Sequence, residues 1–297
     1  MKINPAFFFV EAAAVILFAF GVSESRKKGS GRLLEFLMIF YYGLLLEELD
    51  MRIFKTYHYG TGFLLWMGHA PIAIALLWAV ILASSMAISD RLGLPEFFRP
   101  FADALFAVWI DLSLDAIAIR IGYWQWGIGP NEGWFGVPAG NLYAWMWVAF
   151  WYSALARFIR RRLPKSPNWK GGYFVLPFFA YAGLFISMNS VGMLGRALGL
   201  ISQSRRLYLF WAQFVIFLIF VLTSLPRRKQ AMDKVAAVWS WGRFSVHLYF
   251  LLAFFIFGIF RRVPWLGIVS GRYAGRRILA LPENEARLAS SWVERHF

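Results

Sequence analysis

Residues 104–148 read ALFAVWIDLSLDAIAIRIGYWQWGIGPNEGWFGVPAGNLYAWMWV, and they decide the fold because they set two acids in an otherwise apolar helical run. Asp111 and Asp115 are four residues apart, so on a helix they share one face with side chains about 5–6 Å apart. An acidic side chain near the centre of a membrane helix costs about 2.5–3.5 kcal/mol on insertion. We therefore expect the pair to face the interior of a helix bundle. At this separation two charged carboxylates repel by about 3 kcal/mol, so we expect them to share a proton at neutral pH.

Aromatic and turn-forming residues follow this acidic helix. Desolvated indole and phenol faces attract a cation by about 2 kcal/mol, although the same residue types also anchor helices at membrane interfaces. Asn141 opens the next apolar run and either caps that helix or contacts a ligand. The aromatic residues closest in sequence to the acids are Tyr123, Trp124, Trp126 and Trp134.

The composition indicates a polytopic membrane protein. Of the 297 residues, 60% are hydrophobic and 20% are aromatic, and the mean hydropathy is +0.55. Several apolar runs approach the ~20 residues that span a bilayer. These runs take up most of the chain, so we predict an all-α fold: one transmembrane helical bundle of about seven or eight membrane helices, forming a single domain over residues 1–297.

Eight apolar runs are candidates for these helices. The third run is long enough either to tilt or to kink at His69-Ala70-Pro71, because proline removes an intrahelical hydrogen bond. After the sixth run, Gly195 and Gly199 form a Gly-xxx-Gly pair, which predicts close packing of two helices. The runs cover residues 5–22, 33–46, 62–88, 101–122, 141–158, 173–193, 207–225 and 244–260.

The net charge of +15 is distributed as in a membrane protein rather than as in a nucleic-acid surface. Lys and Arg gather between the apolar runs: six lie in residues 157–172 and none in residues 123–139. The positive-inside rule therefore places residues 157–172 in the cytoplasm and the N-terminus outside, with the first run retained as a helix rather than removed as a signal peptide. No nucleic acid is expected as a partner.

The same rule places the connections 49–61 and 123–139 on one side of the membrane. This arrangement would allow Glu48 and Tyr59 to converge with the aspartate pair. The Arg-rich tail, residues 261–297, carries seven arginines on the side that should be least basic. The sequence therefore leaves open whether the chain has seven or eight spans.

Several chemistries lack the residues that they need. The chain has no cysteine, which excludes disulfides, thiolate nucleophiles and Cys-based metal sites. Its four histidines show no ligand spacing, and no G-x-G-x-x-G, H-E-x-x-H or P-loop motif is present. We therefore expect no metal and no cofactor, which leaves acid–base chemistry in an apolar pocket.

Two motifs resemble a known family. The segments DLSLDAIAIRIGYWQWG, residues 111–127, and WFGVPAGNLYAW, residues 134–145, resemble the integral-membrane carotenoid hydratase family, which includes bisanhydrobacterioruberin hydratases and related carotenoid 1,2-hydratases. Upstream, Glu48 and the triplet Tyr57-His58-Tyr59 are similar to an earlier acidic and Tyr-x-Tyr segment of that family. The resemblance covers roughly residues 40–155.

The resemblance implies a cofactor-independent hydro-lyase. Such an enzyme protonates the terminal C1–C2 double bond of an acyclic (psi) carotenoid end group, and water captures the tertiary carbocation to give a 1-hydroxy carotenoid. The resemblance assigns catalysis to Asp111, Asp115 and Glu48. The implied substrate contacts are Tyr59, Tyr123, Trp124, Trp126, Trp134 and Asn141.

Within the pair we expect Asp115 to be the proton donor, because it lies nearer the aromatic segment, and the charged partner to orient and deprotonate the attacking water. The exchanged assignment stays open. The expected partners are the acyclic carotenoid, water and membrane lipid, with other carotenoid biosynthesis enzymes as further candidates. The expected location is a bacterial or archaeal cell membrane, which the chain crosses several times.

Other classes of protein share parts of this pattern. A carotenoid or lipid carrier needs the aromatic cavity without the paired acids, whereas a proton-coupled transporter needs the acids and a cavity that opens to each side in turn. The aspartates could also be structural, held by a hydrogen bond or paired with Arg120.

Overall fold

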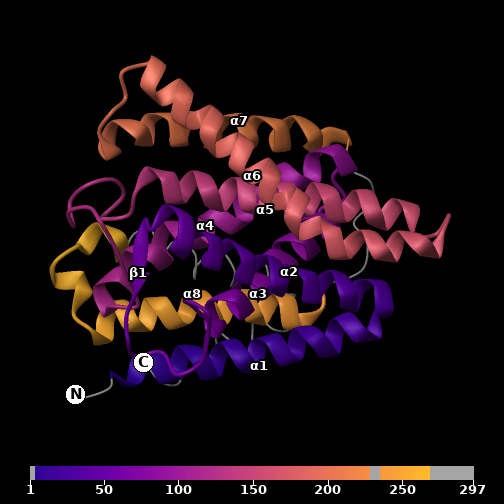
Figure 1. Ribbon diagram of the computed structural model, residues 1–297, viewed down its shortest axis with the longest axis horizontal. Helices are drawn as coiled ribbons and strands as arrows, with labels where there is room; N and C mark the ends of the chain where they lie inside the picture. Colours follow the sequence, from indigo (N-terminus) through magenta and orange to yellow (C-terminus); the bar gives the residue numbers. More distant parts are fainter. Residues whose placement is uncertain (1–3, 228–234, 268–297) are drawn as a thin grey trace.

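The computed structural model describes residues 4–227 and 235–267, and these residues contain eight long α-helices (Figure 1). The helices are α1 (Pro5–Lys27), α2 (Ser30–Leu49), α3 (Ile72–Arg91), α4 (Arg99–Ile121), α5 (Ala139–Arg162), α6 (Gly172–Ala197), α7 (Gln203–Ser224) and α8 (Ala237–Ile256). The strands are β1 (Tyr57–Tyr59), β2 (Trp66–Met67), β3 (Ala70–Pro71) and β4 (Trp124–Trp126). The all-α prediction is confirmed. The Arg-rich tail lies outside the described residues from residue 268 onward.

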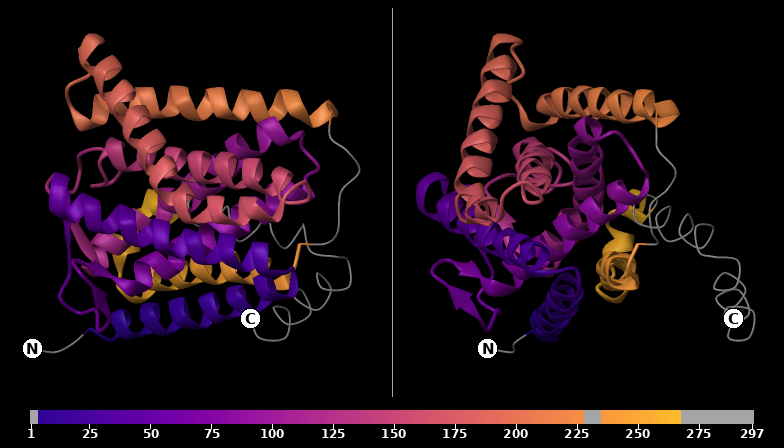
Figure 2. Two further views of the ribbon diagram at one scale, coloured as in Figure 1. Left: turned by 45° about the vertical axis from the view of Figure 1, so that its right-hand side comes forward. Right: turned by 90° about the vertical axis from the view of Figure 1, so that its right-hand side faces the viewer.

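Helix α4 lies at the centre of the bundle. It packs against α3, α5, α7 and α8, and most of its side chains are buried. Helix α1 lies at one edge and α7 at the opposite edge (Figures 1 and 2). Other helices therefore shield the acid-bearing helix, as the cost of an acid in lipid requires.

The outer faces of α6 and α7 are apolar. Their exposed side chains are mostly Phe, Ile, Leu and Val, and a surface of this kind is unfavourable in water. This is a helical membrane protein. The segments that are long and apolar enough to cross a membrane, by length and composition, are Pro5–Lys27, Ile72–Arg91, Pro167–Ala197 and Gln203–Arg227.

The third apolar run is not one helix. Helix α3 begins at Ile72, and the residues before it form a hairpin in which β2 pairs with β3. Proline pushes the residue before it toward extended backbone, and here Ala70 belongs to a strand while Pro71 caps the helix. The predicted kink is wrong, because this proline starts a helix instead of bending a longer one.

Only the first glycine of the Gly-xxx-Gly pair lies at a contact between two helices. A Cβ at Gly195 of α6 would lie 3.4 Å from Leu209 Cδ1 of α7. Gly199 follows α6 with a φ of +67°, a left-handed conformation that glycine adopts without strain, and a Cβ there would have no neighbour within 4 Å. Gly199 therefore turns the chain from α6 toward α7, and the packing prediction holds for Gly195 alone.

The connections that follow α2 and α4 meet at one end of the bundle. Strand β1 pairs with β4 in antiparallel register, with Tyr59 opposite Trp124. The chain can turn from α4 into β4 because Gly122 has a φ of +92°. We call residues 50–71 and 122–138 the ribbon end, and their pairing confirms that the two connections lie together.

The opposite end of the same helices holds paired charges. Arg157 of α5 lies 2.9 Å from Asp103 of α4 and also contacts Asp90 of α3. Arg160 pairs with Glu35 of α2. We call these five residues the arginine end. They include the start of the basic connection that the sequence predicted to be cytoplasmic.

Candidate active site

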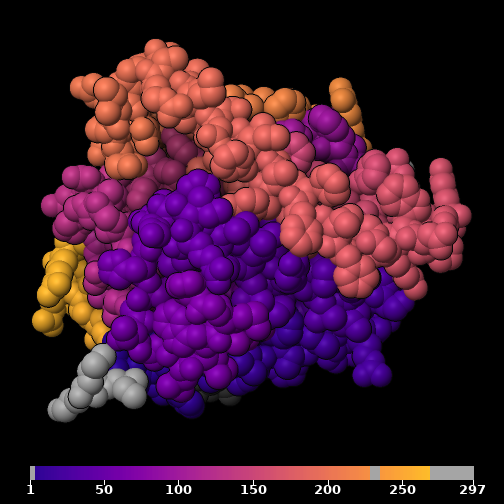
Figure 3. Space-filling model, viewed as in Figure 1, coloured from indigo at the N-terminus to yellow at the C-terminus, as the bar shows by residue number. Residues whose placement is uncertain are grey.

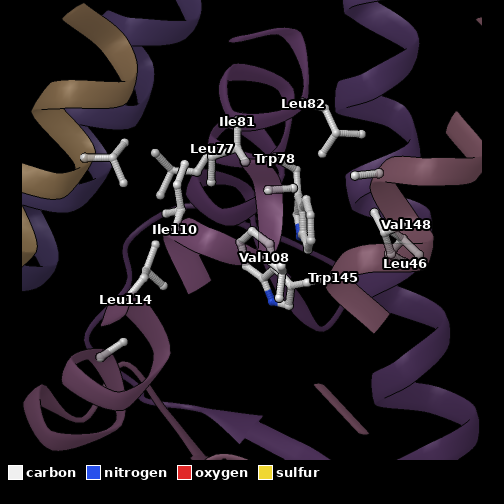
Figure 4. Close-up of a cluster of buried hydrophobic side chains, with 14 of the residues drawn as sticks. Leu46, Leu77, Trp78, Ile81, Leu82, Val108, Ile110, Leu114, Trp145 and Val148 are labelled. Carbon is white, nitrogen blue, oxygen red and sulfur yellow. The ribbon is translucent and has the colours of Figure 1, made fainter. Parts of the chain in front are cut away.

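Two tryptophans form one wall of the site. Trp78 of α3 lies beside Trp145 of α5 among aliphatic side chains, with ring centroids 4.1 Å apart (Figure 4). Ile81 and Leu114, also drawn in Figure 4, border the same space. This side of the site is therefore formed by the hydrophobic core of the bundle.

An inner chamber lies between helices α2, α3, α4 and α5 and the ribbon end. Its volume is about 70 Å³, which is enough for a few water molecules or for the small end of a longer molecule. Apart from the aliphatic and indole walls, the residues that line it are Glu47, Tyr57, Tyr59, Asp115, Trp124, Trp126 and Asn141.

The two aspartates lie on one face of α4, as their spacing predicted. Both are almost completely buried, and their carboxyl groups are within hydrogen-bond reach of each other. The side-chain amide of Asn141 donates to Asp111 Oδ2 at 2.9 Å and to Asp115 Oδ2 at 2.5 Å. Asn141 does not cap α5, because Pro138 occupies that position. It ties α5 to the aspartate pair instead.

No cation in the described part of the chain neutralises the pair. Among the described residues, no salt bridge involves either aspartate, and Asp111 Oδ1 is buried without a hydrogen-bond partner. Arg120 donates instead to the carbonyl oxygens of Ala116 and Phe135, at 2.6 and 2.8 Å. The alternative that Arg120 pairs with the aspartates is therefore wrong. Two adjacent acids without a cation favour a state in which one keeps its proton.

A second acid faces the chamber, and the sequence analysis missed it. Glu47 of α2 is buried and accepts hydrogen bonds from the hydroxyls of Tyr57 and Tyr59 and from Trp78 Nε1, the last at 2.9 Å. The signal was present in the burial stripe of α2, because Ile39, Gly43 and Glu47 follow each other at helical spacing.

Glu48, the expected catalytic acid, is not in the chamber. It pairs with Arg52 and accepts hydrogen bonds from the backbone and the ring of His69, at 2.7 and 3.0 Å. One position along a helix rotates a side chain by about 100°, so the two neighbouring glutamates point to different surroundings. The structure gives Glu47 the position that we expected for Glu48.

The expected aromatic contacts divide into two groups. Tyr59, Trp124 and Trp126 line the chamber, and the indole N–H groups of both tryptophans are buried without a partner among the described residues. Tyr123 and Trp134 do not line it. Their polar atoms bond to the backbone oxygens of Ala6 and Leu112, respectively, so these two side chains hold the fold together around the site.

The tyrosines that contact Glu47 keep their protons. Burial, and next the negative charge of Glu47, raise the pKa of Tyr57 and of Tyr59 well above the usual value of 10. Both phenols therefore act as hydrogen-bond donors at neutral pH.

A wider cavity of about 580 Å³ leads to the chamber. It shares Glu47, Trp126 and Asn141 with the chamber and continues past Leu184 and Met188 of α6. Figure 3 shows the face of the molecule where the connection after α2 adjoins α6, and both elements line this cavity. The inner chamber is thus the end of an apolar route that can take a long hydrophobic molecule.

The described residues also include the side-chain types that bind metal ions, and their grouping bears on whether a metal site exists. Within residues 4–227 and 235–267, no group of three His, Cys, Asp or Glu side chains could hold a metal ion. The chemistry available to the described residues of this site is that of carboxyl, phenol, amide and indole groups.

Comparison with known proteins gives one match. The sequence model of the family described as carotenoid biosynthesis protein matches residues 3–202. The chain belongs to this family. No curated protein and no solved structure matches it. The matched part of this carotenoid biosynthesis protein runs from α1 through α6 and includes Glu47, Asp111 and Asp115, so the site belongs to the family portion of the chain.

Proposed function

We propose that this protein is a carotenoid hydratase, which adds water across the terminal C1–C2 double bond of an acyclic carotenoid and forms a 1-hydroxy carotenoid. The observation that carries the proposal is the buried pair Asp111 and Asp115, which has no cation partner among the described residues and borders an aromatic chamber. Membership of the carotenoid biosynthesis family supports a carotenoid as the substrate.

The aspartate pair supplies the proton. In the pair, one carboxyl is protonated and the other is charged, and Asn141 holds both in place. Transfer of that proton to C2 leaves a tertiary carbocation at C1. A positioned acid of this kind contributes about 10²- to 10⁴-fold to a rate. Asp115 lines the chamber directly, which supports it as the donor and Asp111 as its partner.

The aromatic walls stabilise the cation, and the chamber admits water. The faces of Trp124 and Trp126 border the space that the reacting end of the carotenoid would fill, and an indole face attracts a desolvated cation by about 2 kcal/mol. The unpartnered indole N–H groups offer hydrogen bonds to a water molecule. The wider cavity accommodates part of the polyene behind the reacting end.

Expression in a host that accumulates an acyclic carotenoid tests the proposal. We expect 1-hydroxy carotenoids in the pigment extract, and in ¹⁸O-labelled water the new hydroxyl should carry the label. Label arriving from O₂ would contradict hydration. An unchanged pigment that co-purifies with the protein would indicate a carrier, and altered uptake with unchanged pigment would indicate a transporter.

A further inference from the structure

Among the residues that the structure describes, six acids are buried, and their partners separate them into two classes. Three of them have partners that explain their burial. Glu35 and Asp103 pair with arginines at 2.9 Å or less, and Glu11 accepts the backbone N–H groups of Leu64 and Leu65 at 2.9–3.0 Å. The other three are Glu47, Asp111 and Asp115, which form no salt bridge in the described residues and, unlike Glu11, lie at or next to the chamber.

The hydrogen bonds around Glu47 differ from those around the aspartates. Glu47 accepts from Tyr57, Tyr59 and Trp78, and an indole N–H can only donate. Burial disfavours a charge on Glu47, and the three donors directed at its carboxyl group oppose this by stabilising the charged form, because hydrogen bonds to charged acceptors are the stronger ones. The aspartates share one amide donor and face each other, which favours retention of a proton.

Glu47 and the aspartate pair reach the same chamber from different elements. Glu47 comes from α2 and is held by β1 and α3, whereas Asp115 comes from α4 and is held by α5. A molecule in the chamber therefore meets a proton donor, Asp115, and a proton acceptor, Glu47, and the two belong to separate hydrogen-bond networks.

We infer that Glu47 is the second catalytic carboxyl group of this site, the one that binds the attacking water and takes its proton. This inference rests on the proposed function and assigns the two halves of the reaction to two acids. The aspartate pair gives its proton to C2, and the C1–C2 π electrons form the new C–H bond. The oxygen of water then bonds to C1, and its released proton passes to the Glu47 carboxylate. Return of that proton to the aspartates through water completes the cycle, so that one water molecule is consumed for each double bond.

Deuterium exchange separates the two roles. In D₂O, protonation and its reversal by the aspartates place deuterium at C2 of recovered substrate, and this step does not need Glu47. We expect Glu47→Gln to lower hydration by about a hundredfold while exchange at C2 stays within about threefold of the wild-type rate. Asp115→Asn should lose both hydration and exchange.

The chain offers a matched control one residue away. Glu48→Gln changes the same side chain outside the chamber and should leave hydration and exchange near the wild-type rates. If Glu47→Gln does not accumulate in the membrane, Tyr59→Phe is measured in its place, because it removes one hydrogen-bond donor to Glu47. This variant should lower hydration roughly tenfold without lowering exchange at C2.

The outcomes distinguish this inference from the proposed function. Hydration by Glu47→Gln, or by Tyr59→Phe in its place, at a rate near that of the wild type would contradict the role of Glu47 alone. Loss of both hydration and exchange in a well-accumulated Glu47→Gln would also contradict it. Wild-type protein that neither hydrates nor exchanges any acyclic carotenoid would contradict the proposed function and, with it, this assignment.

Discussion

The arginine end and the ribbon end bury acids in opposite ways. At the arginine end, Asp103 and Glu35 are each matched by a guanidinium group, and Asp90 contacts four arginines. Toward the ribbon end, Glu47 and the aspartates are equally buried but have neutral partners. The helices are the same at both ends, so the difference lies in what surrounds each carboxyl group.

This contrast separates structural from functional burial of charge. A paired buried charge is compensated within the protein, and breaking the pair destabilises the fold because one charge is left alone. An unpaired acid beside a cavity is costly to retain and gains nothing from the packing around it, which makes a role in binding or chemistry the better explanation. The four predictions below test this contrast, in order of decreasing effect.

The two ends should lie on opposite faces of the membrane. Because the chain has no cysteine, the variants Asn131→Cys and Ser166→Cys each carry a single thiol. We expect a membrane-impermeant maleimide applied to intact cells to label Asn131→Cys and not Ser166→Cys, and lysed cells to allow labelling of both. Labelling of both thiols in intact cells would refute the bundle orientation.

Breaking the arginine end should affect stability. Arg157→Met leaves the buried Asp103 without its cation and removes one of the arginines around Asp90, which we expect to cost about 3–5 kcal/mol. The measurement is membrane abundance together with thermal stability in detergent. Arg161→Met on the same helix is the control, because its pair with Glu96 is exposed and contributes about 0–1 kcal/mol. Equal losses in the two variants would show that the buried network does not stabilise the fold.

Changing the aspartate pair should affect activity rather than stability. Asp111→Asn and Asp115→Asn keep the size of the side chain and remove a titratable group, so hydration should fall by about a hundredfold or more with abundance near that of the wild type. Asp103→Asn should show the reverse, with activity falling only as abundance falls. If both chamber variants remain active in a pigment assay, the aspartates are structural polar residues.

The smallest effect is expected at Glu48. Its contacts with Arg52 and His69 are largely exposed, and pairs of this kind contribute about 0.2–1 kcal/mol. Glu48→Gln should therefore change abundance little and hydration by less than about twofold in the pigment assay. A large loss of hydration would return Glu48 to the site that the family resemblance assigned to it.

The sequence alone determined the class of the protein and the central element of its site. Apolar runs of about the length of a bilayer require helices, because the backbone must satisfy its hydrogen bonds internally in lipid. A spacing of four residues places Asp111 and Asp115 on one helical face whatever the rest of the chain does. Residues around this pair indicated a family of membrane proteins that act on carotenoids, and the match confirms a carotenoid biosynthesis family.

The tertiary structure decided which of the remaining polar groups belong to the site. Glu47 and Glu48 are adjacent in sequence, and only the packing of α2 against α3 directs one into the chamber and the other toward Arg52 and His69. Trp126 lines the chamber while Trp134 bonds to a backbone oxygen, although both follow α4. Such assignments depend on contacts between residues far apart in sequence, and local spacing carries no information about them.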